Sequence, residues 1–418
     1  MRILILNQCF HPDIVAVAQH ASDLAAALAA EGHAVTVVAS RHAYTDPKIC
    51  FAVHETWRGC EIRRVPSLGL GKGGKWRRAL DFAVLLMALL WELVRLPLFD
   101  VVIAMTNPPM VGVLAALATR YKGGRLVYWV MDLNPDEAIA AGWLSPNSLA
   151  ARILNRALLF TLRSSHRIIV LDRFMRQRIE AKGVPGERIV VIPPWSHDDV
   201  VRNDPAGRAA FRAAHGLTDK FVVMYSGNLS LVHPLDPLLM AAAELRDRTD
   251  IAFCFVGAGN ALPGVRAFAG AHGLRNIVCV PYQPLGEVGA SLSAADLHTV
   301  VMGEAMVGIV HPCKIYNVLA VGIPILHIGP RRDHIVDIFE GVKTPGAAYD
   351  ADHGDVKAVV SAILDAADRR LGSLQELKSA ASAFSQHSLI PNVIQVLVEA
   401  ARPAASSVLS MKESVSGR

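Results

Sequence analysis

Short apolar runs alternate with helical patterns along this chain, and the whole alternation occurs twice. The first series opens with a predicted strand at residues 2–7, a helix at 18–31 and a strand at 35–39. Strands joined through a helix by short connections pair in parallel, which predicts a doubly wound sheet. The pattern restarts at a strand predicted for residues 221–225. We therefore expect an α/β protein with two such sheets, each in its own domain.

The length of the chain supports this division, because 418 residues exceed what one ordinary core holds. We predict an N-terminal domain at residues 1–198 and a C-terminal domain at 217–384. The polar residues 199–216 would form the linker between them. Residues 385–402 read as a terminal helix, and the Ser-rich residues 403–418 as a disordered tail.

Composition excludes several classes of protein. The formal net charge of +5 suits an anionic substrate or an anionic membrane surface. Basic residues do not form dense runs interleaved with aromatic residues, so we expect no nucleic-acid partner. The six cysteines form no CxxC pair, which argues against a metal site or a disulfide framework and favours the cytoplasm. Residues 1–7 read as a strand and not as a signal peptide.

One predicted helix, at residues 79–96, is strongly apolar. Its apolar run ends before Glu92 and is shorter than the roughly 20 residues that a membrane span needs. Residues 69–78 before it read as a flexible basic loop. The flanking basic residues are Lys75, Arg77, Arg78 and Arg95. Two interpretations stay open: a helix buried against the sheet, or an interfacial helix through which residues 75–95 contact the inner face of a membrane.

Polar groups are dense in the first half of the segment 301–330, and its second half is nearly all apolar. We predict a helix at residues 313–321, ended by Gly322, and a strand at 323–328. Lys314 would lie in the first turn of this helix, where free backbone N–H groups and a mobile cation can bind an anion. A solvated first turn in an ordinary strand–helix unit explains the same residues.

Three further segments follow predicted strands, where parallel sheets bind ligands. Gly227 and Asn228 follow the strand at residues 221–225, and a glycine there lets the backbone approach a phosphate or simply forms a turn. Asp132 ends the strand predicted at residues 125–130. Tyr282 and Gln283, after the strand at 277–280, could meet a nucleobase or only pack. The loop after the first strand lacks a GxGxxG motif, so a dinucleotide site has little support.

Several motifs occur in a characteristic order along most of the chain. They are Phe10–Asp13, Gln19-His20, Glu31–Val37, Tyr225–Leu229, His233–Asp236, Pro312–Tyr316 and Leu319–Pro324. Together they resemble retaining glycosyltransferase family 4, which has the GT-B fold of two Rossmann-like domains with a cleft between them. The resemblance is greatest to the branch that builds bacterial polysaccharides of the colanic-acid and O-antigen type.

This resemblance implies a hexosyltransferase that moves a sugar from a nucleotide-diphosphate sugar, with UDP expected, to a lipid-linked or other glycan acceptor. The N-terminal half would hold the acceptor and the C-terminal half the donor. Family members retain the anomeric configuration and need neither a metal nor a cofactor. Their last helix crosses back to the N-terminal domain. The enzyme would work in the cytoplasm, at the inner face of the membrane.

The resemblance also assigns roles to residues. His20 matches a histidine that faces the donor sugar in relatives, Asp132 could orient an acceptor hydroxyl, and Lys314 would stabilise the leaving diphosphate. We predict these three as catalytic residues and no metal ligands. The predicted donor-binding residues are Gly227, Asn228, His233, Tyr282, Gln283, Glu304, Gly308, His311, Lys314 and Asn317.

The chain departs from the family pattern at three places. Many relatives grip the diphosphate with an Arg and a Lys where this chain has Asn228 and His233, which leaves more of that work to Lys314. The positions of a glutamate pair hold Ile309 and Asn317, and those of a Gly-Gly pair hold Val15 and Ala16. Glu304 could replace the missing sugar contact. The missing glutamate and glycine pairs keep open a non-catalytic subunit that binds nucleotide sugars. Another GT-B activity, such as a 2-epimerase of nucleotide sugars, is the alternative among enzymes.

Overall fold

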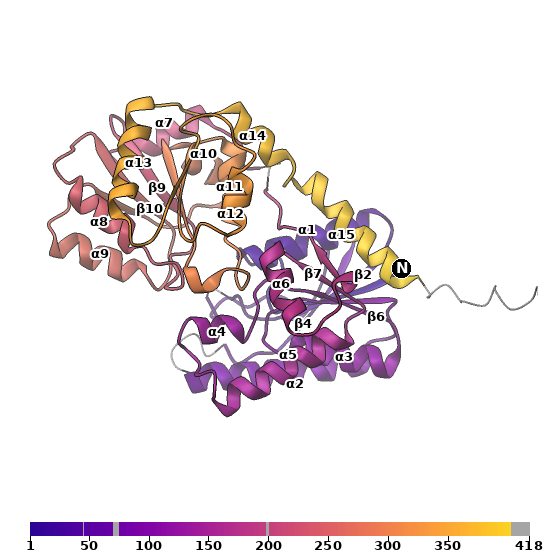
Figure 1. The fold of residues 1–418 in the computed structure, drawn as a ribbon. Helices are drawn as coiled ribbons and strands as arrows, with labels where there is room; N and C mark the ends of the chain where they lie inside the picture. The colour runs from indigo at the N-terminus through magenta and orange to yellow at the C-terminus, as the bar shows by residue number, and fades with distance from the viewer. Residues whose placement is uncertain (45, 70–74, 198–199, 403–418) are drawn as a thin grey trace, which may run out of the picture. The chain divides into compact units, whose positions relative to one another are not determined.

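The computed structural model describes residues 1–44, 46–69, 75–197 and 200–402, and these residues form two sheets (Figure 1). The first sheet has the strand order β3-β4-β2-β1-β5-β6-β7-β8, and the second the order β11-β10-β9-β12-β13-β14. The strands of the first sheet are β1 (Arg2–Leu6), β2 (Ala34–Ser40), β3 (His54–Trp57), β4 (Cys60–Val65), β5 (Val101–Ala104), β6 (Arg125–Trp129), β7 (Arg167–Val170) and β8 (Ile189–Val191). Those of the second sheet are β9 (Phe221–Ser226), β10 (Ile251–Val256), β11 (Ile277–Val280), β12 (Leu297–Val301), β13 (Ile325–Ile328) and β14 (Ala348–Ala351).

The central strands of both sheets pair in parallel. Ile3 of β1 lies beside Val35 of β2 and Val101 of β5, whereas β3 pairs with β4 in the antiparallel sense. In the second sheet, β9 pairs in parallel with both β10 and β12. Parallel strands are buried on both faces, which explains their continuous apolar sequences. The predicted α/β class with two doubly wound sheets is confirmed.

Helices connect the strands in both series. They are α1 (Ala16–Ala30), α2 (Lys75–Arg95), α3 (Val111–Lys122), α4 (Asp136–Ala140), α5 (Leu149–Ser164), α6 (Arg173–Ala181), α7 (Pro205–Ala214), α8 (Asp236–Glu244), α9 (Leu262–Ala271), α10 (Val288–Ser293), α11 (Lys314–Val321), α12 (His334–Phe339), α13 (Val356–Arg369), α14 (Gln375–Ser382) and α15 (Gln386–Ala401). Local sequence sets several of their ends. Asp172 caps α6 by accepting a hydrogen bond from the Met175 N–H, and Gly322 ends α11 at a φ of 75°.

The second sheet is covered on both faces. Phe221, Val223 and Tyr225 of β9 pack in one core, which includes apolar residues of α8 and α13. Val222 and Met224 point to the opposite face, where their core includes residues of α7 and α10. Alternate side chains of β9 thus pack against two separate layers of helices, one on each face of the sheet.

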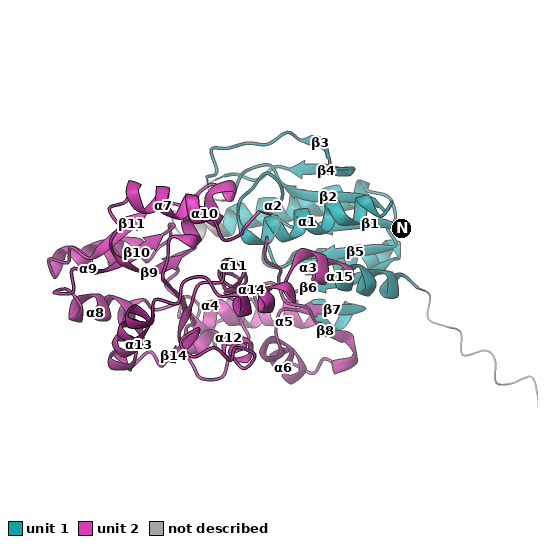
Figure 2. Cartoon of the chain, turned by 90° about the horizontal axis from the view of Figure 1, so that it is seen from above, with its two compact units in different colours: residues 1–129, 161–168, 392–418 teal, residues 130–160, 169–391 magenta. Residues whose placement is uncertain are grey.

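Contacts divide the chain into two compact units, coloured separately in Figure 2. The first unit comprises residues 1–129, 161–168 and 392–418, and the second comprises 130–160 and 169–391. The predicted boundary at residues 199–216 differs from this division, because residues 130–160 after β6 and the chain from Ile169 onward, within β7, group with the second unit. From Asn392 onward α15 groups with the first unit, and the predicted return of the terminal helix stays a prediction. The predicted disorder of residues 403–418 concerns a segment outside the described residues.

Some local predictions need correction. The segment 199–216, expected as a linker, holds α7, whose start is set by the capping side chain of Asp204 and by Pro205. The basic loop predicted for residues 69–78 ends early, because α2 begins at Lys75, while residues 70–74 lie outside the described part of the chain. The short elements β3, β14 and α4 were not predicted, since their sequences lack a clear apolar period.

Helix α7 is anchored to the second sheet through one carboxylate. Arg208 and Arg212 of α7 both form ion pairs with Asp296, which directly precedes β12. Asp296 also accepts a hydrogen bond of 2.8 Å from the Val222 N–H. The Arg212 side chain is only 9% exposed. This segment therefore belongs to the second unit and is not a flexible linker.

We predict that Asp296→Ala lowers the free energy of unfolding by roughly 3 kcal/mol, because it leaves the buried Arg212 guanidinium without its counter-charge. Urea denaturation followed by circular dichroism measures this loss. The control is Asp250→Ala, which removes an ion pair with Arg248 in which both side chains are more than 40% exposed. The control should cost less than about 1 kcal/mol. Equal losses in the two variants would contradict the anchoring role of Asp296.

Candidate functional site

Two glycine loops meet at the carboxyl ends of β9 and β10. Gly227 follows β9 with a φ of 124°, and Gly257 and Gly259 follow β10 with φ of 136° and 147°. A Cβ atom on Gly257 would lie 2.1 Å from the Gly227 carbonyl oxygen, and one on Gly259 would lie 2.3 Å from the Leu229 carbonyl oxygen. Both the positive φ and the close backbone contact require glycine. These loops form a fixed wall at the edge where parallel sheets bind ligands.

Lys314 fills the space that Gly227 leaves open. A Cβ atom on Gly227 would lie 3.3 Å from Lys314 Cε and 3.4 Å from Nζ. Lys314 is the first residue of α11, and its Nζ lies 3.5 Å from the centre of the Tyr225 ring. The absence of a side chain on Gly227 therefore leaves room for the lysine side chain, and the approach of Gly227 to a phosphate stays a prediction.

The Lys314 ammonium is buried and makes no hydrogen bond to another described residue. Burial lowers its pKa from the ordinary lysine value to about 7. The face of the Tyr225 ring attracts the cation but supplies no hydrogen-bond acceptor. A buried polar group without a partner is costly, and such a group commonly marks a place where a ligand binds. An anion that accepts hydrogen bonds would satisfy it.

His233 lies close to Lys314 and is neutral. The pKa of His233 is lowered to about 3, chiefly by burial and to a smaller extent by the positive charge of Lys314. Its Nδ1 accepts a hydrogen bond of 3.3 Å from the Gly303 N–H, as a neutral ring can. His233 therefore adds no second positive charge, so Lys314 is the cation of this site.

Asp132 lies near the start of the same helix. Its carboxylate helps to raise the pKa of the Cys313 thiol, although burial of Cys313 is the larger cause. Burial also raises the pKa of Asp132 itself to about 7, with a smaller contribution from Glu137. A carboxyl group with this pKa can donate or accept a proton near neutral pH. The structure thus brings Asp132 and Lys314, predicted separately, into one region.

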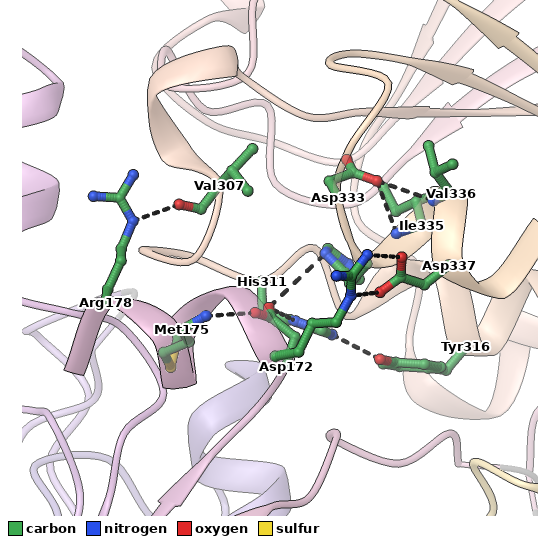
Figure 3. Close-up of polar contacts among 12 residues, drawn as sticks. Asp172, Met175, Arg178, Val307, His311, Tyr316, Asp333, Ile335, Val336 and Asp337 are labelled. Atoms are coloured by element: carbon green, nitrogen blue, oxygen red, sulfur yellow. Dashed lines mark hydrogen bonds and ion pairs between the residues drawn. The ribbon is translucent and has the colours of Figure 1, made fainter. Parts of the chain in front are cut away.

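His311 has a different role from the predicted donor contact (Figure 3). Its Nδ1 lies 2.8 Å from the Asp172 carboxylate, and its Nε2 lies 2.7 Å from the Tyr316 hydroxyl. The His334 ring stacks on it with a centroid distance of 3.7 Å. In this arrangement Nδ1 can donate to the Asp172 carboxylate, and Nε2 can accept from the Tyr316 hydroxyl. Both ring nitrogens are therefore occupied, and His311 fixes the approach to α11.

Asp172, His311 and His334 could together hold a metal ion, because each offers a ligand atom and these atoms lie within 4.8 Å of one another. However, both nitrogens of His311 already have hydrogen-bond partners. A metal ion would have to displace Asp172 or Tyr316 from its present contact. The expected absence of metal ligands stays a prediction.

The loop between β12 and α11 is held by backbone contacts. Arg178 Nε donates a hydrogen bond of 2.7 Å to the Val307 carbonyl, and the Leu133 N–H donates one of 2.8 Å to the Ile309 carbonyl (Figure 3 shows the first). Gly308, with a φ of 70°, packs so closely that a Cβ atom would lie 2.7 Å from the Phe174 carbonyl carbon. Gly308 is thus explained by packing against α6.

Asn317 is also engaged within the protein, because its Oδ1 accepts a hydrogen bond of 3.1 Å from the His197 N–H. Asn228 is exposed, and its carbonyl accepts a hydrogen bond from the Tyr225 hydroxyl. Gln283 donates to the Pro281 carbonyl, and the Tyr282 hydroxyl lies 3.5 Å from the Ala258 carbonyl. Tyr282 therefore lies beside the loop after β10, with nearly half of its side chain exposed.

His20 is buried in α1 of the first unit, whereas Lys314 and its neighbours belong to the second unit. Its role in catalysis stays a prediction. The sequence did not identify Tyr225 as the partner of Lys314. A tyrosine at the end of an apolar strand, two residues before a glycine, was the available signal.

Comparison with known proteins identifies related sequences. Residues 16–195 match the sequence profile described as a glycosyl transferase 4-like domain. The chain is 26% identical over 387 residues to WcaI of Escherichia coli (strain K12), a protein named for a glycosyl transferase role in colanic acid biosynthesis. This match covers 88% of this chain and 92% of WcaI.

Solved structures share the fold. Anabaena HepE, crystallised with UDP, superimposes with a TM-score of 0.70 and 14% identity, covering 96% of this chain and 100% of HepE. WaaG, a glycosyltransferase involved in lipopolysaccharide biosynthesis, superimposes with a TM-score of 0.67 and 16% identity, covering 94% of this chain and 99% of WaaG. The predicted arrangement of two Rossmann-like domains is confirmed by these two structures.

Proposed function

Because this chain is a glycosyltransferase with the GT-B fold, we propose that it transfers a sugar from a UDP-sugar to a lipid-linked or other glycan acceptor. The observation that carries this proposal is the buried Lys314 ammonium, which has no hydrogen-bond partner among the described residues. It lies at the carboxyl edge of the second sheet, at the start of α11. We further propose that the product is a cell-surface polysaccharide, as the name of WcaI suggests for that relative.

The chemistry of the leaving group explains why a cation is needed there. Cleavage of the bond between the sugar and the β-phosphate leaves a nucleoside diphosphate, which gains negative charge in the transition state. A preorganised ammonium and a helix N-terminus stabilise such charge most strongly where water is excluded. Lys314 supplies both, because it is buried and begins α11.

Asp132 is suited to hold the acceptor. Its pKa of about 7 lets the carboxylate accept a proton from an attacking hydroxyl near neutral pH. We propose that it orients this hydroxyl while the diphosphate leaves. Attack from the face that the leaving group vacates would retain the anomeric configuration, as in the family that the sequence resembles.

UDP is the nucleotide to test first, because HepE binds UDP and UDP-glucose in its crystal structures. The half-exposed Tyr282 offers an aromatic face beside the loop after β10 on which a base can stack. We also propose that transfer needs no metal and no cofactor, because Lys314 supplies the positive charge that a divalent ion would otherwise bring to the diphosphate.

Helix α2 supports a second proposal, that the enzyme works at a membrane surface. Its buried side chains include Leu85, Leu89 and Leu93. A further stripe, here called the outer stripe, is apolar yet exposed, with Met87 71%, Trp91 59% and Val94 60% exposed. Leu80 and Leu90 complete the outer stripe at helical spacing. A helix that is apolar on two sides has more apolar surface than the sheet covers.

The charges around α2 favour an anionic lipid surface as the occupant of the outer stripe. Arg77 and Arg95 are exposed near its two ends, and the Arg95 guanidinium lies 4.4 Å from the Trp91 ring centre. The acidic side chains of α2 are used internally, since Asp81 accepts from the Leu68 N–H and Glu92 pairs with Arg63. In the described part of the chain, no helix is long and apolar enough to cross a bilayer. We therefore propose peripheral contact with the cytoplasmic leaflet.

Calorimetric titration with UDP, GDP, ADP and TDP tests the donor site. We predict that UDP binds most tightly and that Lys314→Ala weakens UDP binding roughly 30-fold, since a charge-assisted hydrogen bond to phosphate is lost. Lys343→Ala, which removes an exposed lysine of the same unit, should bind UDP as the wild type does. EDTA should change neither affinity nor transfer. If Lys314→Ala binds UDP normally, the proposed diphosphate site is wrong.

Flotation with phosphatidylglycerol-containing vesicles tests the membrane contact. We predict that the wild type floats with the vesicles and that Met87→Glu with Trp91→Glu reduces the bound fraction at least about fivefold, because carboxylates then face lipid. The control is Met240→Glu, which changes an exposed methionine of α8 in the second unit. A wild-type protein that stays behind in the soluble fraction would exclude this proposal.

A further inference from the structure

A cavity of about 260 Å³ lies in the second unit, close to Lys314 but outside the proposed diphosphate site. Three segments line it, and the lining residues include Trp143, Leu231, Val232, Gly303, Glu304 and Met306. Trp143 and Leu231 are large apolar residues that are 48% and 60% exposed. Neither has a role in the site described above.

The walls of this cavity are held in fixed positions. A Cβ atom on Gly303 would lie 2.1 Å from the Val232 carbonyl oxygen, so these two segments are in direct backbone contact. The Gly303 N–H also donates to His233 in the neighbouring segment. On the other side, the Trp143 N–H donates a hydrogen bond of 2.9 Å to the Ala138 carbonyl, which closes the end of α4. The aromatic side chain therefore starts from a well-defined backbone.

The chemistry of the lining fits a sugar ring. An indole ring and the buried Met306 offer apolar surface against which the C–H face of a pyranose can pack. Glu304 is exposed at the same cavity, and its carboxylate can accept hydrogen bonds from two neighbouring hydroxyls. The negative charge of Glu304 disfavours phosphate. A neutral ring with hydroxyl groups meets both requirements.

The cavity adjoins the site of the proposed reaction. Val232 lines it, and the next residue, His233, is close enough to Lys314 for the lysine charge to lower the histidine pKa. A ring in the cavity would thus lie near the diphosphate proposed at Lys314. Trp143 and Leu231 are exposed, whereas the Lys314 ammonium is buried. The cavity therefore suits a sugar that enters from solvent and leaves as part of a longer product.

We propose that this cavity binds a hexopyranose ring of the glycan acceptor, with Trp143 as its stacking surface and Glu304 as its hydrogen-bond acceptor. The assignment rests on the proposed glycosyl transfer and adds the acceptor subsite to it. It moves Glu304 from the predicted donor-binding residues to the acceptor subsite. Trp143 and Glu304 would then determine which terminal sugar is accepted.

Saturation-transfer difference NMR tests the proposal on the full chain saturated with UDP. The probes are the methyl glycosides of glucose, galactose, mannose and N-acetylglucosamine at millimolar concentration. We predict that at least one of them binds and that Trp143→Ala weakens it roughly threefold to tenfold. Glu304→Gln should weaken it by a similar factor. Tyr121→Ala, which removes an exposed aromatic side chain of the first unit, should leave binding unchanged.

Calorimetry on the same samples separates this proposal from the donor proposal. Trp143→Ala should bind both UDP and UDP-glucose as the wild type does. Weaker binding of UDP-glucose with unchanged UDP binding would place the donor sugar in the cavity and overturn the acceptor assignment. Failure of every glycoside to bind the UDP-saturated wild type, or normal glycoside binding by Trp143→Ala, would also overturn it. If the wild type does not bind UDP, the proposed donor site is wrong.

Discussion

One buried ammonium organises the candidate site. Lys314 Nζ lies against the face of Tyr225 and has no hydrogen-bond acceptor among the described residues. Burial lowers its pKa to about 7, so near neutral pH the amine is about half protonated, and a bound anion would favour the charged form. Such a group interacts strongly with an anion that enters the site, because little solvent screens the pair. The proposed role in diphosphate departure follows from this environment.

The surrounding structure serves to hold this ammonium in place. Gly227 leaves room for the lysine side chain, and Gly257 packs on the Gly227 carbonyl. His311 links Asp172 to Tyr316 (Figure 3). Tyr316 lies in α11, two residues after Lys314. His233 stays neutral and so does not compete for the anion. The site is thus one cation in a rigid frame, in place of the Arg and Lys pair that the family resemblance implies.

Sequence reasoning recovered the fold well because apolar periodicity and helix caps are local signals. The end of α11 at Gly322 lies where the sequence indicated. Lys314 was identified from its place at a helix start. Its partner Tyr225 and the link from His311 to Asp172 were missed, because each joins residues far apart in sequence. Spacing along a chain does not encode such contacts, so His311 was expected to face a ligand.

Titration of Lys314 by NMR tests the central claim most directly. With lysines labelled at Cε and Nζ, the Lys314 signal can be assigned from its absence in Lys314→Met. Without nucleotide, the signal should titrate with a pKa of about 7. Saturation with UDP should raise this pKa toward the ordinary lysine value, because the bound diphosphate favours the charged form. A Lys314 that titrates as an ordinary lysine and does not respond to UDP would contradict the account.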